Sequence, residues 1–394
     1  MKILAIHNFH RKGSASGDDQ VFKSETALLE EHSNTVVRYS VCNDEFDNVG
    51  LIGKITKTFG MIWSFKNYRE VSNLIKRENP DVVHIHTFFP LLSPSVLYAA
   101  KREGCKVVAT LHDTRFVCPC ATSLRGTVLC NECGDGHYLR MCKYGCFKNS
   151  KAQSLLVAAN FKYHRIRKTF YKMIDKYICL NENQMTLLEE IGFDSKKMIK
   201  KYNFVPDAEA SLEPEKVSGI PDRYVVFYGR IGEEKGIRIL MKIWEQIDDI
   251  PLVVMGGGPL EEEFAEWAKN HNNVYFLGYT QHNKCLSIVK GGEFVVFPSI
   301  WYEGCSMVEI ESESLGNALV ATDLGFSVEA IENGYNGYKV SLGDVEGFVK
   351  RIREMWADPD KCEEMGRNAR KDYEAKYLPE DNYKQLISIY YSLC

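Results

Sequence analysis

Residues 297–322 have the sequence FPSIWYEGCSMVEIESESLGNALVAT, and they indicate the fold class of the whole chain. The apolar run Phe294–Phe297 predicts a buried strand that ends at Pro298. A short loop follows, residues 306–315 have helical spacing, and Leu319–Ala321 predict another strand. Strand, helix and strand in this order form the unit of a parallel sheet covered by helices, so an α/β fold is expected.

Two carboxylates in this stretch indicate a binding site. Glu303 lies in the loop before the helix, and Glu311 lies a turn or two inside it. A helix N-terminus favours phosphate, because its free backbone N–H groups carry a partial positive charge. Carboxylates beside such a site need hydroxyl partners, and a nucleotide sugar offers both phosphates and hydroxyls. The alternative is two solvated carboxylates on a surface helix.

The wider pattern resembles the donor-site signature of family 4 retaining glycosyltransferases, and most closely the members that build capsules and cell-surface polysaccharides. The resemblance implies that Glu303 faces the donor sugar and that Glu311 holds the ribose hydroxyls. At Cys305 and Ser306 the family more often has Phe and Gly. The matching residues are Pro298, Ser299, Trp301, Tyr302, Glu303, Gly304, Val308, Glu311 and Gly316.

Length and composition indicate a soluble protein of two domains. The chain has 394 residues, of which 45% are hydrophobic and 26% charged. No apolar run approaches the roughly 20 residues needed to span a bilayer. The N-terminal residues MKILAIHNF predict a strand rather than a signal peptide, so a cytoplasmic location is expected. The 13 Cys are an odd number, which argues against a pure disulfide framework.

Charge is divided unevenly along the chain. Residues 1–200 contain 29 Lys and Arg against 20 Asp and Glu, a net charge of +9, and the remainder carries 20 against 33, or −13. A basic first half indicates an anionic surface or substrate for the first domain. Nucleic acid is not the expected partner, because no Lys/Arg-rich motif interleaved with aromatic residues is present.

Short apolar strands alternate with helical intervals over the whole chain, which predicts βαβ units in two doubly wound domains. The first helix is expected from Asp18 to about Glu31. The expected strands are Lys2–His7, Thr35–Ser40, Val82–His86, Lys106–His112, Lys176–Leu180, Ile199–Val205, Tyr224–Gly229, Leu252–Gly256, Val274–Leu277, Phe294–Phe297, Leu319–Ala321 and Tyr338–Val340.

The resemblance implies the GT-B architecture, in which two Rossmann-like domains face a cleft. Residues 1–205 would form the acceptor-side domain, and 223–379 the nucleotide-sugar-binding domain. Residues 206–222 are polar and rich in Pro and Glu, as expected of a linker. Residues 380–394 have amphipathic spacing, and in a GT-B protein this helix would return to the first domain. A helix that stays on the second domain is the alternative.

Cations follow the first strand of the second domain, in the segment Tyr228–Gly236 (YGRIGEEKG). Arg230 and Lys235 would lie at the carboxyl end of that strand, where doubly wound sheets bind ligands. A guanidinium fork and an ammonium point charge suit a diphosphate. The segment resembles the family's diphosphate-binding segment, which implies that both cations stabilise the leaving nucleotide. An exposed polar turn is the alternative.

Further site residues are implied by the resemblance. Leu277 ends a strand, and its backbone would pair with the base of the nucleotide. In the first domain, the small-residue loop Gly13–Asp19, with Gly17, opens a helix and could approach a phosphate through its amides. His112 follows a strand and matches the family's cleft histidine, which contacts the donor sugar. His84 is expected to pack in the core, and His86 is a candidate cleft residue.

No catalytic metal is expected. No Asp-x-Asp pair follows an apolar strand, and Asp358-Pro359-Asp360 is typical of a turn. Members with the GT-B fold generally work without a metal. No candidate nucleophile is apparent, so a phosphate oxygen of the donor is the expected base for the acceptor hydroxyl, with retention of anomeric configuration. Glu303, His112, Arg230 and Lys235 are the predicted catalytic residues.

The insert at residues 118–146 is rich in cysteine. Cys130 and Cys133 have the C-x-x-C spacing of a metal half-site, with further thiols on both sides. A structural zinc ion held by Cys118, Cys130, Cys133 and Cys142 is predicted, with Cys120 and Cys146 as alternates. Free thiols are the other interpretation.

Two basic, aromatic segments predict an interfacial patch. Residues 51–69 (LIGKITKTFGMIWSFKNYR) place apolar side chains on one stripe with lysines around it, and residues 161–176 (FKYHRIRKTFYKMIDK) are similar. Together they could dock on anionic lipid. Ordinary amphipathic core helices with solvated lysines are the alternative.

These features together predict a cytoplasmic glycosyltransferase, peripheral at the inner face of the membrane. It would move a hexose from a nucleotide-diphosphate sugar to a growing, lipid-linked surface glycan without a metal cofactor. One alternative is a GT-B sugar-nucleotide epimerase, or a synthase that acts on a soluble acceptor. The other is a non-catalytic, zinc-stabilised binding module, against which Arg230, Lys235, Glu303 and Glu311 argue.

Overall fold

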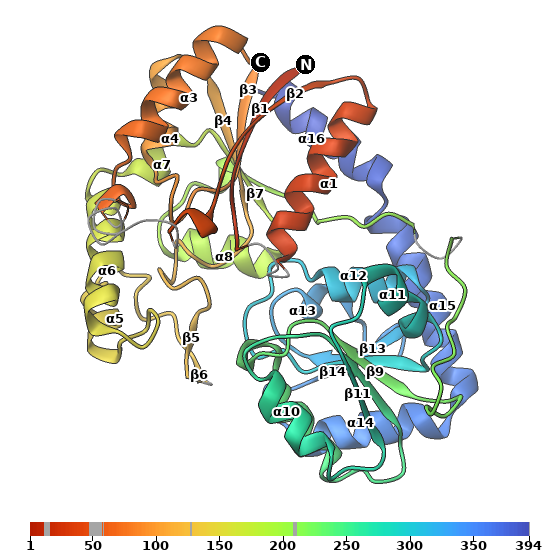
Figure 1. Cartoon of the computed structure of the whole chain (residues 1–394). Coiled ribbons are helices and arrows are strands. Elements are labelled where there is room, and N and C mark those ends of the chain that lie inside the picture. Colours follow the sequence, from red (N-terminus) through yellow and green to blue (C-terminus); the bar gives the residue numbers. More distant parts are fainter. Residues whose placement is uncertain (12–15, 47–56, 58, 127, 208–210, 394) are drawn as a thin grey trace. The chain divides into compact units, whose positions relative to one another are not determined.

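The computed structural model describes residues 1–11, 16–46, 57, 59–126, 128–207 and 211–393. The chain divides into two compact units (Figure 1). The first comprises Met1–Arg125, Cys130–Tyr202 and Asn382–Cys394, and the second comprises Gly126–Leu129 and Asn203–Asp381.

From Met1 to Tyr202 the described helices and strands are β1 (Lys2–Phe9), α1 (Gly17–Glu31), β2 (Thr35–Cys42), α3 (Phe65–Glu78), β3 (Val82–Thr87), α4 (Ser95–Arg102), β4 (Lys106–Leu111), β5 (Leu124–Arg125), β6 (Val128–Leu129), α5 (Leu139–Tyr144), α6 (Lys151–Ile166), α7 (Thr169–Met173), β7 (Lys176–Cys179), α8 (Glu182–Glu190) and β8 (Met198–Lys200), with 3₁₀ turns at Asn43–Phe46 and Ser195–Lys197.

From Asn203 onward they are β9 (Val225–Tyr228), a 3₁₀ turn (Glu233–Lys235), α9 (Ile237–Trp244), β10 (Leu252–Met255), α10 (Glu261–Ala268), β11 (Val274–Gly278), α11 (His282–Lys290), β12 (Phe294–Phe297), α12 (Met307–Ser314), β13 (Ala318–Thr322), α13 (Ser327–Ala330), β14 (Gly337–Val340), α14 (Val345–Ala357), α15 (Pro359–Lys376) and α16 (Pro379–Tyr391).

The first unit is built on a six-stranded parallel sheet in the order β2-β1-β3-β4-β7-β8. Its central strands are buried on both faces, as parallel strands covered by helices must be, and they are mainly apolar apart from His7, Asn8, His84 and His86. One face packs against α3, α4, α6 and α7. The other packs against Leu29 of α1 and against Leu386, Ile389 and Tyr390 of α16.

The second unit has a six-stranded parallel sheet in the order β11-β10-β9-β12-β13-β14. Its largest core cluster joins this sheet to α9, α10, α14 and α15. Two parallel sheets in two Rossmann-like halves confirm the predicted α/β class. Residues 206–222, which the sequence marks as a linker, contain no α-helix or strand among those described.

One strand prediction is wrong in part. The expected strand Ile199–Val205 is reduced to β8, which ends at Lys200. Phe204 and Val205 are nevertheless buried, and the Tyr373 hydroxyl donates to the Val205 carbonyl over 2.9 Å. An apolar run in the sequence indicates buried side chains but not the element that buries them. Here the side chains are buried by packing beyond the edge of the sheet rather than by hydrogen-bonded pairing within it.

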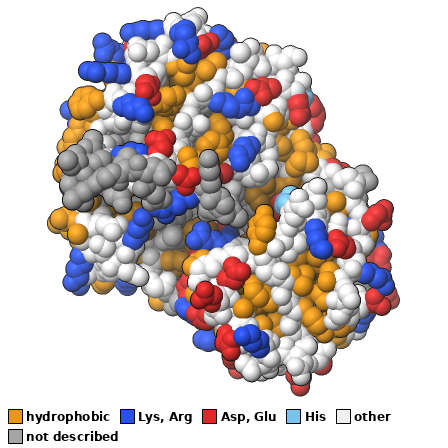
Figure 2. Space-filling view, in the orientation of Figure 1, with side chains coloured by type: hydrophobic (Ala, Val, Ile, Leu, Met, Phe, Trp, Pro, Cys, Tyr) orange, Lys and Arg blue, Asp and Glu red, His pale blue; other side chains and the backbone are white. Residues whose placement is uncertain are grey.

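Among the described residues, no helix combines the length and the apolarity that crossing a bilayer requires. On the face shown in Figure 2, Lys and Arg side chains are dispersed among acidic and hydrophobic ones rather than gathered in one stripe.

Candidate functional site

The second sheet reverses its strand order between β9 and β12. β9 and β12 are neighbours in the sheet. The chain leads from β9 to β10 on one side of this pair and from β12 to β13 on the other side, so the loops that follow β9 and β12 diverge. In open α/β sheets this switch point at the carboxyl ends of the strands is where ligands bind. The segment with Arg230 and Lys235 follows β9, and Glu303 follows β12.

A close backbone approach brings the two loops together. Gly236 has a φ of +73°, and a Cβ there would lie 1.8 Å from the carbonyl oxygen of Pro298. Only glycine tolerates both the conformation and the contact. The approach places Lys235 Nζ 2.5 Å from Glu303 Oε1, which also accepts from the Ser299 hydroxyl over 2.8 Å.

Both cations of the predicted phosphate site have carboxylate partners within the second unit. Lys235 pairs with Glu303 and lies 5.3 Å from the ring centroid of Trp301. Arg230 Nε lies 3.2 Å from Glu234 Oε1, and 48% of the Arg230 side chain is exposed. The half-exposed Arg230 guanidinium can exchange its partner for a phosphate at small cost.

Helix α12 contributes the second predicted carboxylate. Its N-cap Ser306 accepts from the backbone N–H of Glu309, and Tyr228 donates to the Val308 carbonyl over 2.8 Å. Burial raises the pKa of Glu311 to about 8, and a hydrogen bond from Tyr228 lowers it in part. His282 Nε2, at the start of α11, lies 3.7 Å from Glu311 Oε1.

The remaining predicted residues of the second unit lie around this point. Gly304 and Val308 are half-buried in the loop and first turn that carry Glu303 and Glu311. Leu277 is on β11, which is separated from β9 by β10. The segment after β11 leads into α11 and so to His282.

The sequence did not single out two further glutamates of α12. Glu309 and Glu313 are fully buried, and their carboxylate oxygens have no hydrogen-bond partner of standard geometry among the described residues. Burial raises the pKa of Glu309 to about 8 and that of Glu313 well above its usual range. The burial of these two carboxyl groups becomes apparent only from the packing of α12.

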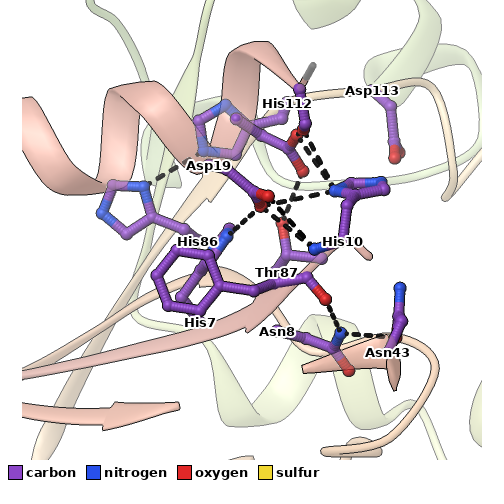
Figure 3. A network of polar contacts seen from close by, with 12 residues as sticks. His7, Asn8, His10, Asp19, Asn43, His86, Thr87, His112 and Asp113 are labelled. Atoms are coloured by element: carbon purple, nitrogen blue, oxygen red, sulfur yellow. Dashed lines mark hydrogen bonds and ion pairs between the residues drawn. The ribbon is translucent and has the colours of Figure 1, made fainter. Parts of the chain in front are cut away.

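The first sheet has its own switch point, between β1 and β3. Polar side chains gather there at the carboxyl ends of the strands (Figure 3). Asp19 at the start of α1 accepts from the backbone N–H of His10, and its Oδ1 lies 2.8 Å from His7 Nε2. Thr87 at the end of β3 donates to Asp18. Gly17 is exposed at the first position of α1.

His112 also lies in this cluster (Figure 3). Its Nε2 is 3.1 Å from Nδ1 of His86, the candidate cleft residue of β3. Burial, and then the charge that His86 can carry, lower the pKa of His112 to about 3, so the ring is neutral at physiological pH. The Gln184 amide donates to the carbonyl oxygens of Leu111 and Asp113 and fixes the loop that holds His112.

Two groups of described residues place three potential metal ligands within 4.8 Å of one another: His7, Asp18 and Asp19, and Glu25, His84 and His86. In the first group Asp19 is already bonded to His7. In the second, Lys201 Nζ lies 3.0 Å from Glu25 Oε2, and an ammonium ion there opposes a bound cation. Neither group contains a cysteine, so the described thiols form no assembled site of this kind.

The cysteines of the insert form no disulfide among the described residues, and four of them, Cys120, Cys133, Cys142 and Cys146, lie in or against the core of the first unit. The pKa of Cys118 is lowered to about 7, mainly by a hydrogen bond from the Cys120 thiol. Burial opposes this shift, and hydrogen bonds from the backbone amides of residues 120, 122 and 123 add to it. Charges on Cys118 and Cys130 contribute to the raised pKa of Cys146, after burial. For Cys142 burial alone raises the pKa. Cys146 is therefore electrostatically closer to the other thiols than Cys142 is.

Parts of five predicted features lie outside the described residues. These are residues 13–15 of the small-residue loop, residues 51–56 and 58 of the first basic, aromatic segment, residue 127 of the cysteine-rich insert, residues 208–210 of the linker and residue 394 of the C-terminal segment.

Two models of known protein families match this chain. Residues 213–372 match the family model described as "Glycosyl transferases group 1", and residues 30–209 match the model for Glycosyltransferase Family 4. Together the two models match most of both units. The chain belongs to glycosyltransferase family 4.

Relatives of this family 4 glycosyltransferase include the D-rhamnosyltransferase WbpZ of Pseudomonas aeruginosa, 24% identical over 54% of this chain and 58% of the relative. The capsular polysaccharide biosynthesis glycosyltransferase CapM of Staphylococcus aureus is 27% identical over 53% of this chain and 56% of the relative. The chain thus matches little more than half the length of these curated relatives.

Solved structures share the fold of this family 4 glycosyltransferase. HepE of Anabaena in complex with UDP superimposes with a TM-score of 0.69 at 16% identity over the whole of both chains. Sucrose-phosphate synthase of Thermosynechococcus elongatus gives 0.75 at 17% identity, over 100% of this chain and 99% of that one. The fold is GT-B, as predicted.

Proposed function

We propose that this protein transfers a sugar from a nucleotide-diphosphate sugar to a growing, lipid-linked surface glycan with retention of anomeric configuration. The observation that carries the proposal is the contact between Lys235 and Glu303 at the switch point of the second sheet, beside Arg230. A cation for the diphosphate and a carboxylate for the sugar hydroxyls are held together there by Gly236.

Each side chain has a role in the reaction. Lys235 and Arg230 bind the diphosphate and stabilise the negative charge that develops as it leaves. Glu311 holds the ribose hydroxyls, while Glu303 and His112 contact the transferred sugar. The bond between the anomeric carbon and phosphate oxygen breaks as the acceptor oxygen attacks from the same face. The acceptor proton passes to the departing phosphate oxygen, so no metal or protein nucleophile is required.

The relatives suggest the substrates. HepE was solved with UDP and with UDP-glucose, which makes uracil the first base to test in the donor. CapM is named for capsular polysaccharide biosynthesis, and an O-antigen chain mannosyltransferase of Escherichia coli is 24% identical over 44% of this chain. A surface glycan assembled on a lipid is the acceptor these names support, and a hexosyl donor is the substrate class.

A thermal-shift screen with UDP, GDP and ADP sugars tests the proposal. One donor at a hundred times its Kd stabilises the protein by about 2.7 kcal/mol, a shift of a few degrees. Turnover of that donor should continue in excess EDTA, and the anomeric configuration of the product, measured by NMR, should match that of the donor. No stabilisation by any nucleotide sugar, or an inverted product, would contradict the proposal.

A further inference from the structure

Asn203 is a buried residue that contacts the loop of the candidate site from the segment after β8. It is 4% exposed. Its side-chain amide donates to the Cys305 carbonyl over 3.1 Å, and its backbone N–H donates to Cys305 Sγ over 3.3 Å. Residues 298–306, which join β12 to α12, are here called the Glu303 loop. Two hydrogen bonds to one residue therefore attach Asn203 to this loop.

The segment that carries Asn203 is itself fixed to α15. Val205 is buried, and its carbonyl accepts from the Tyr373 hydroxyl over 2.9 Å. Both terminal nitrogens of Arg370 donate to the Asp207 carboxylate, over 2.8 and 2.7 Å. A bidentate pair of this kind also restricts direction. Asn203 therefore reaches the Glu303 loop from a segment that the second unit holds in place.

The Glu303 loop is held at a second point. The backbone N–H of Phe326 donates to the Glu303 carbonyl over 3.1 Å. Gly325 has a φ of +59°, and a Cβ there would lie 2.6 Å from the Glu303 backbone nitrogen, so this approach requires glycine. The backbone that carries the Glu303 side chain is thus fixed at its own carbonyl and again, two residues later, at the carbonyl of Cys305.

Helix α12, which carries Glu311, has an attachment that does not involve Asn203. The Tyr228 hydroxyl, at the end of β9, donates to the Val308 carbonyl in the first turn of α12 over 2.8 Å. Loss of the Asn203 amide should therefore release the loop and leave this first turn in place. The consequences for Glu303 and for Glu311 can for that reason be measured separately.

We propose that Asn203 is a positioning residue, which fixes the backbone of the Glu303 loop and so directs the Glu303 carboxylate to the hydroxyls of the transferred sugar. The inference rests on the proposed function, in which Glu303 contacts that sugar and Glu311 holds the ribose. A carboxylate on a displaced loop would keep its charge but would lose the alignment on which the rate of transfer depends.

Asn317 offers a matched control in the same unit. It is also 4% exposed, and its amide donates to the Gly292 carbonyl over 2.9 Å. Its Oδ1, like that of Asn203, is buried without a hydrogen-bond partner among the described residues. Gly292 precedes β12, so this contact does not involve the Glu303 loop. Alanine at either position removes the same groups from an equally buried site, and the two variants should lose similar thermal stability.

The state of the loop can be measured without substrate. Trp301 lies in the loop, with its ring centroid 5.3 Å from Lys235 Nζ. The whole chain labelled with 5-fluorotryptophan gives a ¹⁹F resonance for each of its five Trp, and Trp301→Phe assigns the signal. Asn203→Ala should shift or broaden the Trp301 resonance, whereas Asn317→Ala should leave it at the wild-type position. An unchanged Trp301 resonance in Asn203→Ala would overturn the proposal.

Nucleotide binding and sugar release distinguish positioning from a general loss of structure. The first probes are UDP and UDP-glucose, and hydrolysis of UDP-glucose gives kcat with water as the acceptor. Asn203→Ala should reduce kcat by about tenfold or more while the Kd of UDP stays within about twofold of the wild type. Asn317→Ala should keep both values. Parallel losses of kcat and UDP affinity in Asn203→Ala, or equal losses of kcat in the two variants, would overturn the proposal.

Two further arms keep the test decisive. If Asn203→Ala does not fold, Asn203→Ser takes its place with the same expectations, because a serine side chain is polar but lacks the amide. If the donor screen selects GDP or ADP sugars, the corresponding diphosphate and sugar replace the uridine pair. The expected ¹⁹F change, in a protein whose wild type binds no nucleoside diphosphate and hydrolyses no nucleotide sugar, would refute the proposed function while the contact between Asn203 and the loop stands.

Discussion

Lys235 and Arg230 are the two residues whose loss should affect catalysis more than folding. Removing one charged donor to a developing phosphate charge costs roughly 3 kcal/mol, or about a hundredfold in rate. Lys235→Ala and Arg230→Ala should each reduce kcat by about that factor at saturating donor. Arg238→Ala is the control, since Arg238 is 48% exposed and pairs with Glu233 and Glu263 in the same way. Full activity in the Lys235/Arg230 double variant would refute the site.

Glu309 should make stability fall as pH rises. Burial raises its pKa to about 8 in the folded protein, so folding favours the protonated form. Its stabilising contribution is complete below the pKa of the unfolded chain, about 4.5, and is lost as pH rises toward 8. The loss is on the order of several kcal/mol.

Urea unfolding at several pH values tests this expectation. Glu309→Gln should reduce the decline in unfolding free energy between pH 5 and 8, whereas a Gln at the exposed Glu262 of α10 should leave it unchanged. Equal slopes in the wild type and Glu309→Gln would show that the buried carboxyl does not titrate in this range.

Single residues differ in how far the sequence predicts them. Lys235 and Glu303 could be found because each lies in a short motif at the end of an apolar strand. The pairing of Glu25 with Lys201 could not, because 176 positions separate the two residues and the lysine lies among other basic side chains. The local sequence around a charged residue does not show whether that residue is paired inside the fold or exposed to solvent.

At the scale of elements, the strands were predictable where they are buried on both faces. β12 begins and ends as expected, and α12 begins after its serine cap. The order of strands in each sheet was not predictable, because periodicity carries no information on lateral pairing. The strand order creates both switch points. The sequence motifs therefore indicated which residues form the site, whereas their positions relative to one another follow from the strand order.

The cysteine insert is the element most open to test. We propose that it binds one structural zinc ion per chain through Cys118, Cys130, Cys133 and a fourth thiol. Zinc prefers four tetrahedral thiolates, and Cys118, whose pKa is near 7, is already a good ligand. Elemental analysis of protein purified without added metal should find about one zinc, lost with thermal stability in Cys130→Ser/Cys133→Ser.

Two single variants identify the fourth ligand. The sequence spacing favours Cys142, whereas the electrostatic proximity of Cys146 to Cys118 and Cys130 favours Cys146. Only the variant that removes the true ligand, Cys142→Ser or Cys146→Ser, should lower zinc affinity by tenfold or more. Metal-free protein that is fully folded, with all six thiols of the insert titratable, would leave them as packing residues.

At the scale of the whole molecule, the uneven charge predicts binding to anionic membranes. α6 exposes Tyr163 and Ile166, with 42% and 71% of each residue accessible, among basic neighbours. Each basic residue near an anionic bilayer contributes about 1 kcal/mol, and salt screens it. Cosedimentation with phosphatidylserine vesicles should therefore decrease as salt rises.

Charge-reversal variants distinguish vesicle binding by the basic, aromatic patch from an effect of the overall net charge. Lys66→Glu/Lys162→Glu/Arg167→Glu should reduce vesicle binding sharply. The variant Lys242→Glu/Lys350→Glu/Lys371→Glu changes the net charge by the same amount, but on the second unit, and it should reduce vesicle binding little. All six of these side chains are exposed. Equal binding to neutral and anionic vesicles would leave the patch as ordinary surface.

The route of the chain also has a consequence for its synthesis. Residues 382–393 pack in the first unit, yet the ribosome makes them only after the whole of the second unit. Until they emerge, the face formed by Ile3, Val82 and Ile178 lacks its cover, and His84 lacks the Tyr390 hydroxyl. The second unit can therefore mature first, while the nascent first unit keeps an open apolar surface that a chaperone would recognise.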